Sequence, residues 1–146
     1  MRIAVGSDHA GFDLKTALAE HVAGSGHDVD DLGTDSERSV DYPVFGAAVG
    51  RAVSEGQAEL GVCTCGTGIG IAIAANKIDG VRAAVVHDVT TARLARAHNH
   101  ANVVCMGGRM VGTEVAKDAI DAFLATEPAG GRHDHRIAEI AALELR

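Results

Sequence analysis

Segments of strand length alternate with amphipathic segments along almost the whole chain, and this alternation restricts the fold more than any other feature. The segments of strand length cover residues 2–7, 27–32, 59–64, 81–86 and 102–106. Apolar residues recur at helical spacing in residues 11–24, 43–53, 71–77, 88–96, 112–125 and about 134–145. Strands that alternate with helices at this pitch indicate βαβ units. The sequence therefore predicts an α/β fold with a parallel sheet of about five strands.

The boundaries of several elements are marked by individual residues. The strand at 27–32 is polar, which suits the edge of a sheet. Pro43 suits the first turn of a helix, and Asp88 can cap the helix that follows it. A break at residues 127–131, rich in glycine, precedes the last helix. With no repeat and no linker, residues 1–146 are expected to form a single domain.

The charge and the cysteine content exclude several classes of partner. A formal net charge of -7 disfavours nucleic acid and anionic membranes as partners, so a cationic site would have to be local. The three cysteines form no disulfide framework, which fits a reducing compartment. No apolar run is long enough to span a membrane, and the first residues lack the apolar core of a signal peptide. We therefore expect a cytoplasmic protein.

Polar residues follow four of the expected strands. They are Asp8-His9, Cys65 to Gly70, His87-Asp88 and Gly107 to Arg109. In parallel α/β sheets, ligands bind outside the carboxyl ends of the strands. This placement is the first indication of a functional site.

The loop from Cys65 to Gly70, of sequence CGTGIG, lies between a strand and a helix. Its glycines allow backbone N–H groups to converge, and the helix start adds positive potential, so the loop could hold a phosphate or an oxyanion. A tight turn with glycines for packing alone remains an equal alternative. The spacing GxGxG, after the third strand, argues against the dinucleotide-binding pattern GxGxxG.

Cys65 begins this loop and is a candidate base. A helix N-terminus can favour a thiolate, which could remove a proton alpha to a carbonyl. The alternative is a small buried apolar residue, which is the usual fate of a free cysteine and the one we expect for Cys63 and Cys105.

Candidate acids and cations occur later in the chain. His98 could act as an acid or base, although a helix-end histidine without such a role is an alternative. His98 and His100 have metal-ligand spacing, but no other residues complete a site, so no metal is expected. Arg132 and Arg136 are four residues apart on one helix face and could hold a phosphate, unless they mark only a solvated helix start. Arg109 is a third candidate cation.

These segments together resemble a known family. GSDHAGFDLK at 6–15, DYP at 41–43, CGTGIGIAIAANK at 65–77, HN at 98–99, GGRMVG at 107–112 and GGRH..R at 131–136 occur in the family's order. The chain resembles the type B ribose-5-phosphate isomerases, within the wider family that includes allose- and galactose-phosphate isomerases. The likeness covers nearly the whole chain.

The resemblance implies a Rossmann-like α/β/α sandwich and a homodimer, or a dimer of dimers, whose active sites use residues from both subunits. It implies no cofactor, a place in carbon metabolism such as the pentose phosphate pathway, and a last helix that contributes to dimerisation. The implied catalytic residues are Cys65 as base, His98 as the acid for ring opening, Asp8 and Thr67. The implied substrate-binding residues are Asp8, His9, Tyr42, Gly66, Thr67, Gly68, Ile69, Gly70, Asn99, Arg109, Arg132, His133 and Arg136.

Some branches of this family replace the cysteine with a glutamate further along the loop. Here Cys65 is present and residues 71–73 are aliphatic or small, so the cysteine mechanism is implied. Thr64 and His100 depart from the family pattern and could alter substrate choice. The expected reaction is the interconversion of ribose 5-phosphate and ribulose 5-phosphate through an enediolate. The alternatives are the same reaction on a tetrose or hexose phosphate, or a non-catalytic phosphate- or nucleotide-binding module.

Overall fold

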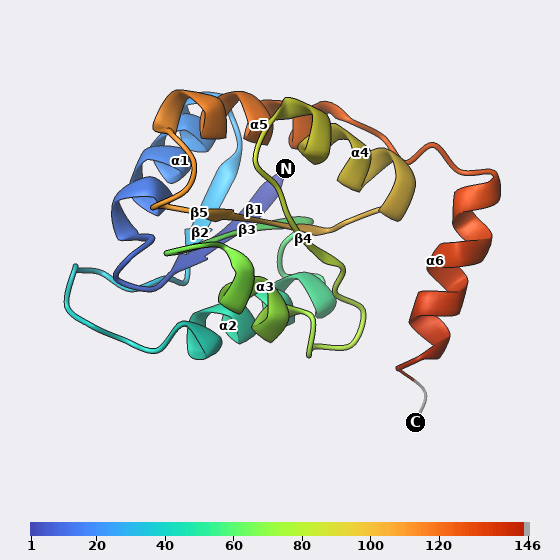
Figure 1. Ribbon diagram of the computed structural model, residues 1–146, viewed down its shortest axis with the longest axis horizontal. Coiled ribbons are helices and arrows are strands. Elements are labelled where there is room, and N and C mark those ends of the chain that lie inside the picture. The colour runs from blue at the N-terminus through green and yellow to red at the C-terminus, as the bar shows by residue number, and fades with distance from the viewer. Residues whose placement is uncertain (145–146) are drawn as a thin grey trace.

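A five-stranded parallel sheet lies between two layers of helices in the computed structural model, which describes residues 1–144 (Figure 1). The strands are β1 (Arg2–Ser7), β2 (Asp28–Asp31), β3 (Leu60–Cys65), β4 (Ala83–Val85) and β5 (Val103–Gly107). The helices are α1 (Phe12–Gly24), α2 (Tyr42–Ser54), α3 (Ile69–Ala75), α4 (Val89–Asn99), α5 (Thr113–Ala125) and α6 (Arg132–Ala142). The predicted α/β sandwich is confirmed.

The strand order places the longest strands in the middle of the sheet. The order is β2-β1-β3-β5-β4, and all neighbours are parallel. Polar β2 forms one edge, as the sequence predicted, and three-residue β4 forms the other. The chain leaves β1 toward one edge and later returns to β3 on the other side of β1. Such a reversal creates a crevice at the carboxyl ends of the strands.

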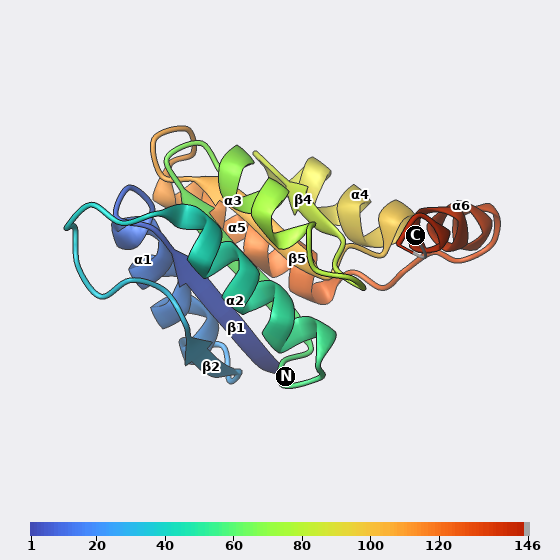
Figure 2. The same cartoon turned by 90° about the horizontal axis from the view of Figure 1, so that it is seen from below.

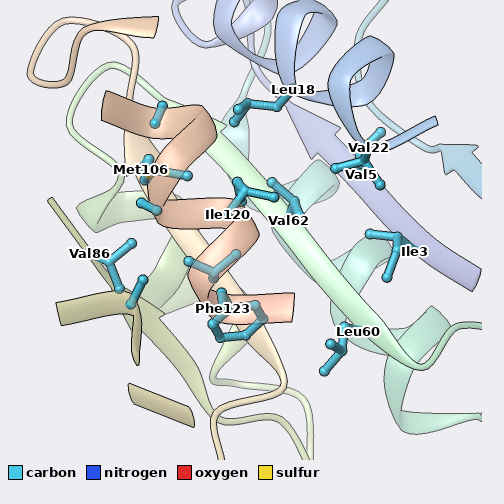
Figure 3. Close-up of a cluster of buried hydrophobic side chains, with 14 of the residues drawn as sticks. Ile3, Val5, Leu18, Val22, Leu60, Val62, Val86, Met106, Ile120 and Phe123 are labelled. Carbon is cyan, nitrogen blue, oxygen red and sulfur yellow. The ribbon is translucent and has the colours of Figure 1, made fainter. Parts of the chain in front are cut away.

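Two apolar cores hold the helices to the sheet. One core joins the sheet to α1, α4 and α5, and Phe123, Leu18 and Met106 are fully buried in it (Figure 3). The other core joins the opposite face to α2 and α3 through Val49, Ile71 and smaller residues. The two layers are seen above and below the sheet in Figure 1, and α2 and α3 lie in front in Figure 2.

Helix α6 is different, because it stands away from the sheet at one end of the molecule (Figures 1 and 2). None of its residues is buried, and its contacts within the chain are mainly with α4. Ile140 on α6 and Leu143 just after it remain exposed. Over residues 1–144, no helix has both the length and the apolar character needed to cross a membrane.

Most predicted boundaries are correct within two residues, and the ends of α4 at Asn99 and of α6 at Ala142 each differ by three. Strand β4 is shorter than predicted because the Arg82 N–H donates to Asn102 Oδ1, at 2.7 Å, in place of a ladder bond. Helix α6 begins at Arg132 rather than near 134, directly after Gly131 at φ 62°. The last predicted position of that helix, residue 145, lies outside the described residues. Asp88 caps α4 as predicted, accepting the Thr91 N–H at 2.7 Å.

Candidate active site

Three loops meet at the carboxyl edge of the sheet, because β1, β3 and β5 are adjacent and parallel. Thr64 Oγ1 donates to the Gly11 carbonyl at 2.7 Å and thereby joins the first loop to the second. The Gly108 N–H donates to the Cys65 carbonyl at 2.8 Å, and the Arg109 N–H donates to the Gly66 carbonyl at 3.0 Å. The structure therefore brings together three of the four polar segments that the sequence singled out.

The fourth segment has a local role. Asp88 accepts the N–H of Thr91, and the His87 N–H donates to Thr91 Oγ1 at 3.0 Å. Both residues thus belong to the start of α4, beyond the edge strand β4.

Cys65 lies at the end of β3 with 4% of its surface exposed. Its Sγ atom accepts the Gly68 N–H at 3.1 Å, which places a hydrogen-bond donor against the position of a thiolate. Gly68 adopts φ 80°, and a Cβ there would lie 2.7 Å from the backbone of Met106. The Ile69 N–H donates to Thr67 Oγ1 at 3.2 Å. The loop therefore surrounds the sulfur with backbone atoms: Gly68 has no side chain, and the Thr67 hydroxyl is bonded to the loop backbone.

Two large side chains flank this loop at its glycines. A Cβ at Gly66 would lie 3.1 Å from Arg109 Nη1, and a Cβ at Gly70 would lie 2.6 Å from the Tyr42 ring. A cation and an aromatic ring thus approach the backbone closely where no side chain intervenes. This arrangement can bind an anion beside the thiol and place an aromatic ring against one side of a bound ligand.

Asp8 and His9 are held by backbone groups at the same edge. Asp8 is 6% exposed, and its Oδ1 accepts the Gly11 N–H at 3.0 Å. His9 Nδ1 accepts the Val40 N–H at 3.1 Å, which leaves Nε2 as the protonated nitrogen of the neutral ring. His9 therefore presents a hydrogen-bond donor for a ligand.

The other predicted site residues lie at the opposite end of the strands, where the strands begin. Helix α4 runs back along the sheet, so His98 and Asn99 in its last turn lie near the amino end of β5. Register pairs Cys65 with Gly107 and Gly61 with Val103. Gly61 and Cys65 are four positions apart on β3, which corresponds to about 13 Å along the strand. One chain does not bring Cys65 and His98 together.

The second group is organised by α6. The ring of His133 stacks on that of His98, with 4.4 Å between centroids and 15° between planes. Arg132 and Arg136 lie on the same helix. Desolvation lowers the pKa of His133 below its ordinary value, and the charges of His98, Arg132 and Arg136 act in the same direction while Asp134 opposes them. This end of the molecule thus concentrates positive charge that could bind a phosphate.

A hollow of about 470 Å³ separates α6 from the β4 edge. Its lining is mostly apolar, with Val81, Ala84, Ile140 and Leu143 among its residues, and it also contains Asn99 and Arg82. Arg82 was not among the predicted site residues, although an arginine at the start of an otherwise apolar strand is an unusual feature of the sequence. Among residues 1–144, no cluster of three or more histidine, cysteine or acidic side chains has the arrangement of a metal site.

Comparison with known proteins assigns the chain to a family. Residues 3–140 match the sequence model of the family described as Ribose/Galactose Isomerase. Ribose-5-phosphate isomerase B of Escherichia coli (strain K12) is 45% identical over 145 residues, which cover 99% of this chain and 97% of that protein. The galactose-6-phosphate isomerase subunit LacB of Clostridium acetobutylicum is 45% identical over 124 residues, which cover 85% of this chain and 72% of that protein.

A solved structure extends this similarity to three dimensions. Ribose-5-phosphate isomerase B of Clostridium thermocellum superimposes with a TM-score of 0.98 at 46% identity, covering 99% of this chain and 98% of that one. The sequence resemblance is therefore confirmed, and the chain belongs to the ribose/galactose isomerase family.

Proposed function

We propose that this protein interconverts ribose 5-phosphate and ribulose 5-phosphate, with Cys65 as the base. The observation that carries the proposal is the Cys65 thiol at the carboxyl edge of the sheet, where it receives the Gly68 N–H beside a glycine-rich loop and Arg109. Two relatives with 45–46% identity over nearly the whole chain are named for this activity.

The reaction needs one base and a stabilised enediolate. The Cys65 thiolate removes the proton from C2 of the open-chain aldose, and the electron pair moves toward the C1 carbonyl oxygen. The same proton is then delivered to C1 while the proton of the C2 hydroxyl passes to the C1 oxygen, so that C2 becomes the carbonyl of the ketose. Backbone N–H groups of the loop at residues 66–70, other than the Gly68 and Ile69 N–H groups that donate to Cys65 and Thr67, would stabilise the enediolate oxygens together with the Thr67 side chain. A well-placed donor of this kind contributes about 2.7–4 kcal/mol in other enzymes.

The other residues would bind and open the sugar. His98 would move the proton that opens the furanose ring, and Asp8, His9, Tyr42 and Asn99 would contact sugar hydroxyls. Arg109, Arg132, His133 and Arg136 would hold the phosphate, whose binding energy positions the reacting carbons. These roles need both groups of residues in one site.

A second copy of the chain would bring the two groups together. In one chain, Cys65 lies at the carboxyl ends of the strands and His98 lies near their amino ends. Helix α6 buries none of its residues, and an apolar-lined hollow opens beside it. Ile69 and Ile73, on the helix that follows the Cys65 loop, are each more than half exposed. A twofold dimer in which α3 of one copy covers the hollow of the other would complete two sites at once.

The same reasoning supports the domain assignment. Residues 1–146 would form one isomerase domain, in which α6 serves dimerisation rather than the core of its own chain.

The first test is ketose formation from ribose 5-phosphate by the purified wild-type protein and by Cys65→Ala. We expect turnover in the wild type and a loss of at least about a thousandfold in the variant, because the reaction loses its base. Cys63→Ala is the matched control, since Cys63 lies two residues earlier on the same buried strand face. A folded Cys65→Ala protein with wild-type activity would disprove the role of Cys65.

A hexose phosphate is the second candidate substrate, because a relative with 45% identity is named as a galactose-6-phosphate isomerase subunit. The two candidates are separated by kcat/KM for ribose 5-phosphate, a tetrose phosphate and galactose 6-phosphate. A folded wild-type protein that prefers galactose 6-phosphate would replace the first proposal with the second.

A further inference from the structure

Two arginines bind the backbone where α4 ends, directly after His98 and Asn99. Arg82 Nε donates to the His100 carbonyl at 2.9 Å, and Arg96 Nη1 donates to the Ala101 carbonyl at 2.7 Å. We call Arg82 and Arg96 the arginine clamp. Arg82 comes from the approach to β4 and Arg96 from α4 itself, so the clamp ties the helix end to the sheet edge.

The backbone at this point needs such support. The last carbonyls of a helix have no partner within the helix, and here the chain reverses direction within a few residues to enter β5. His100 makes the reversal at φ 47°, a left-handed conformation that residues other than glycine adopt at some cost in energy. Cationic donors at a helix C-terminus satisfy the free carbonyls and interact favourably with the helix dipole.

Asn102 strengthens the hold on Arg82. Its Oδ1 accepts the Arg82 N–H at 2.7 Å, and its Nδ2 donates to the Gly80 carbonyl at 2.8 Å. The backbone of Arg82 is therefore fixed independently of its side chain. Because the Arg82 backbone is fixed, its side chain extends from a defined position to the His100 carbonyl.

Arg96 extends the support to α6. Its Nε donates to the Thr126 carbonyl at 3.3 Å, at the start of the connection to α6, and the Ala129 N–H donates to the Ala97 carbonyl at 2.9 Å. This connection leads to His133, whose ring stacks on His98. Arg96 is thus hydrogen-bonded both to the backbone after α4, which carries His98, and to the connection that leads to His133.

No ion pair within 4.0 Å joins either arginine to a carboxylate of residues 1–144. Desolvation lowers the pKa of both guanidinium groups, against the charge of Glu144 at Arg82 and of Glu127 at Arg96. Arginine nevertheless stays charged in proteins. Arg82 therefore holds the backbone of His100 without a carboxylate partner in the described part of the chain. Arg96 holds the backbones of Ala101 and Thr126, while its Cζ lies 5.6 Å from the centroid of the Phe123 ring.

We propose that Arg82 is a positioning residue for isomerisation, acting through the His100 carbonyl on the placement of His98 and Asn99. This inference rests on the proposed function, in which those two residues contact the sugar. Arg82 itself is assigned no contact with the reacting carbons. Its contribution is geometric, and an error of about 1 Å in the placement of an acid can lower a rate by about a hundredfold.

The test compares two substitutions of similar length that differ in whether a hydrogen-bond donor occupies the position of the arginine Nε. In Arg82→Gln, Nε2 occupies the position of the arginine Nε and can still donate to His100, whereas Arg82→Met places a methyl group there. We expect Arg82→Met to lower kcat by about tenfold or more and Arg82→Gln to stay within about threefold of the wild type. Arg93→Gln is the matched control, because Arg93 is an exposed arginine on α4.

A double-mutant cycle separates positioning from general loss of structure. If Arg82 acts through the placement of His98 and Asn99, Arg82→Met should lower kcat by a much smaller factor in a His98→Ala background than in the wild type, with only the part that acts through Asn99 left. Circular dichroism and light scattering of each variant would check that the fold and the assembly are unchanged. An equal loss of kcat in both backgrounds would overturn the proposal.

The remaining outcomes are also decisive. A folded Arg82→Gln protein that loses kcat by tenfold or more would overturn the role of the hydrogen bond, and this holds even if Arg82→Met does not fold. Wild-type activity in folded Arg82→Met would overturn the inference while leaving the proposed function intact. Absence of isomerase activity in the wild type would instead count against the proposed function.

Discussion

Of the three cysteines, Cys65 alone lies where a substrate could reach it. Cys63 and Cys105 lie opposite each other in the middle of the sheet, and both are fully buried. The side-chain hydrogen bond from Cys63, together with burial, raises the pKa of Cys105 well above its ordinary value, so this thiol stays neutral. Cys65 lies at the strand end and receives a backbone N–H on its sulfur. Position along the strand thus separates an inert thiol from a candidate base.

His100 should make the stability of the protein depend on pH. Desolvation and the charges of Arg82 and Arg96 lower its pKa in the folded state, against Asp134 and Glu127. The folded state therefore binds fewer protons than the unfolded state, and His100 destabilises the protein as the pH falls below about 6.5. Asparagine has no such charge and tolerates a positive φ better.

We therefore expect His100→Asn to raise the free energy of unfolding slightly at pH 7.5 and by more at pH 5.5. Urea unfolding of both proteins at the two pH values would measure the difference. A benefit from the substitution that is the same at both pH values would show that backbone conformation, and not charge, determines the effect.

At the scale of elements, the Cys65 loop depends on the way α3 begins. Gly68 precedes α3 at φ 80°, and a Cβ there would meet the Met106 backbone at 2.7 Å. Gly68→Ala should therefore lower the free energy of unfolding by about 2 kcal/mol or more and displace the N–H that contacts Cys65. Activity should fall further than the loss of folded protein explains.

Gly112→Ala is the matched control for this prediction, because Gly112 also precedes a helix but has a negative φ and open space around its Cα. Thermal unfolding and kcat of the two variants give the comparison. Equal effects of the two substitutions would show that the shape of the Gly68 turn is unimportant.

The elements themselves were largely predictable from local patterns, but their order in the sheet was not. All five strands were expected, and the polar character of 27–32 correctly indicated an edge. The exchange of β4 and β5 in the sheet depends on long-range packing that no local pattern records. The length of β4 was overestimated, because the Arg82 N–H donates to the Asn102 side chain in place of a ladder bond.

The candidate site was predictable only where it follows strands. Asp8, Cys65 and Arg109 come after parallel neighbours, so topology alone brings their loops together. His98 lies in the last turn of a helix that runs antiparallel to the strands, which places it near the amino ends of the strands. The direction of that helix could have revealed this separation. The stacking of His133 on His98 depends on α6, whose packing the sequence pattern did not indicate.

At the scale of the whole molecule, the separation of the two groups leads to a prediction about mixed dimers. If each site takes Cys65 from one copy and His98 from the other, every site of a Cys65→Ala or a His98→Ala dimer lacks one of the two groups and retains only a small residual activity. In a mixed dimer, one site carries both substitutions and the other carries neither. Such a dimer should therefore regain half of the wild-type activity per dimer.

The two variants would be unfolded together at equal concentration and refolded, and turnover of ribose 5-phosphate would then be measured. Random assembly makes about half of the dimers mixed, so the sample should recover about a quarter of wild-type activity. Refolding each variant alone, and mixing the two without unfolding, are the controls. Recovery would also identify α6 as part of a shared site, because His133 on α6 stacks on the His98 that crosses to the partner's Cys65. If both residues instead acted within one chain, no arrangement of the two variants would produce an intact site and the mixture would stay inactive.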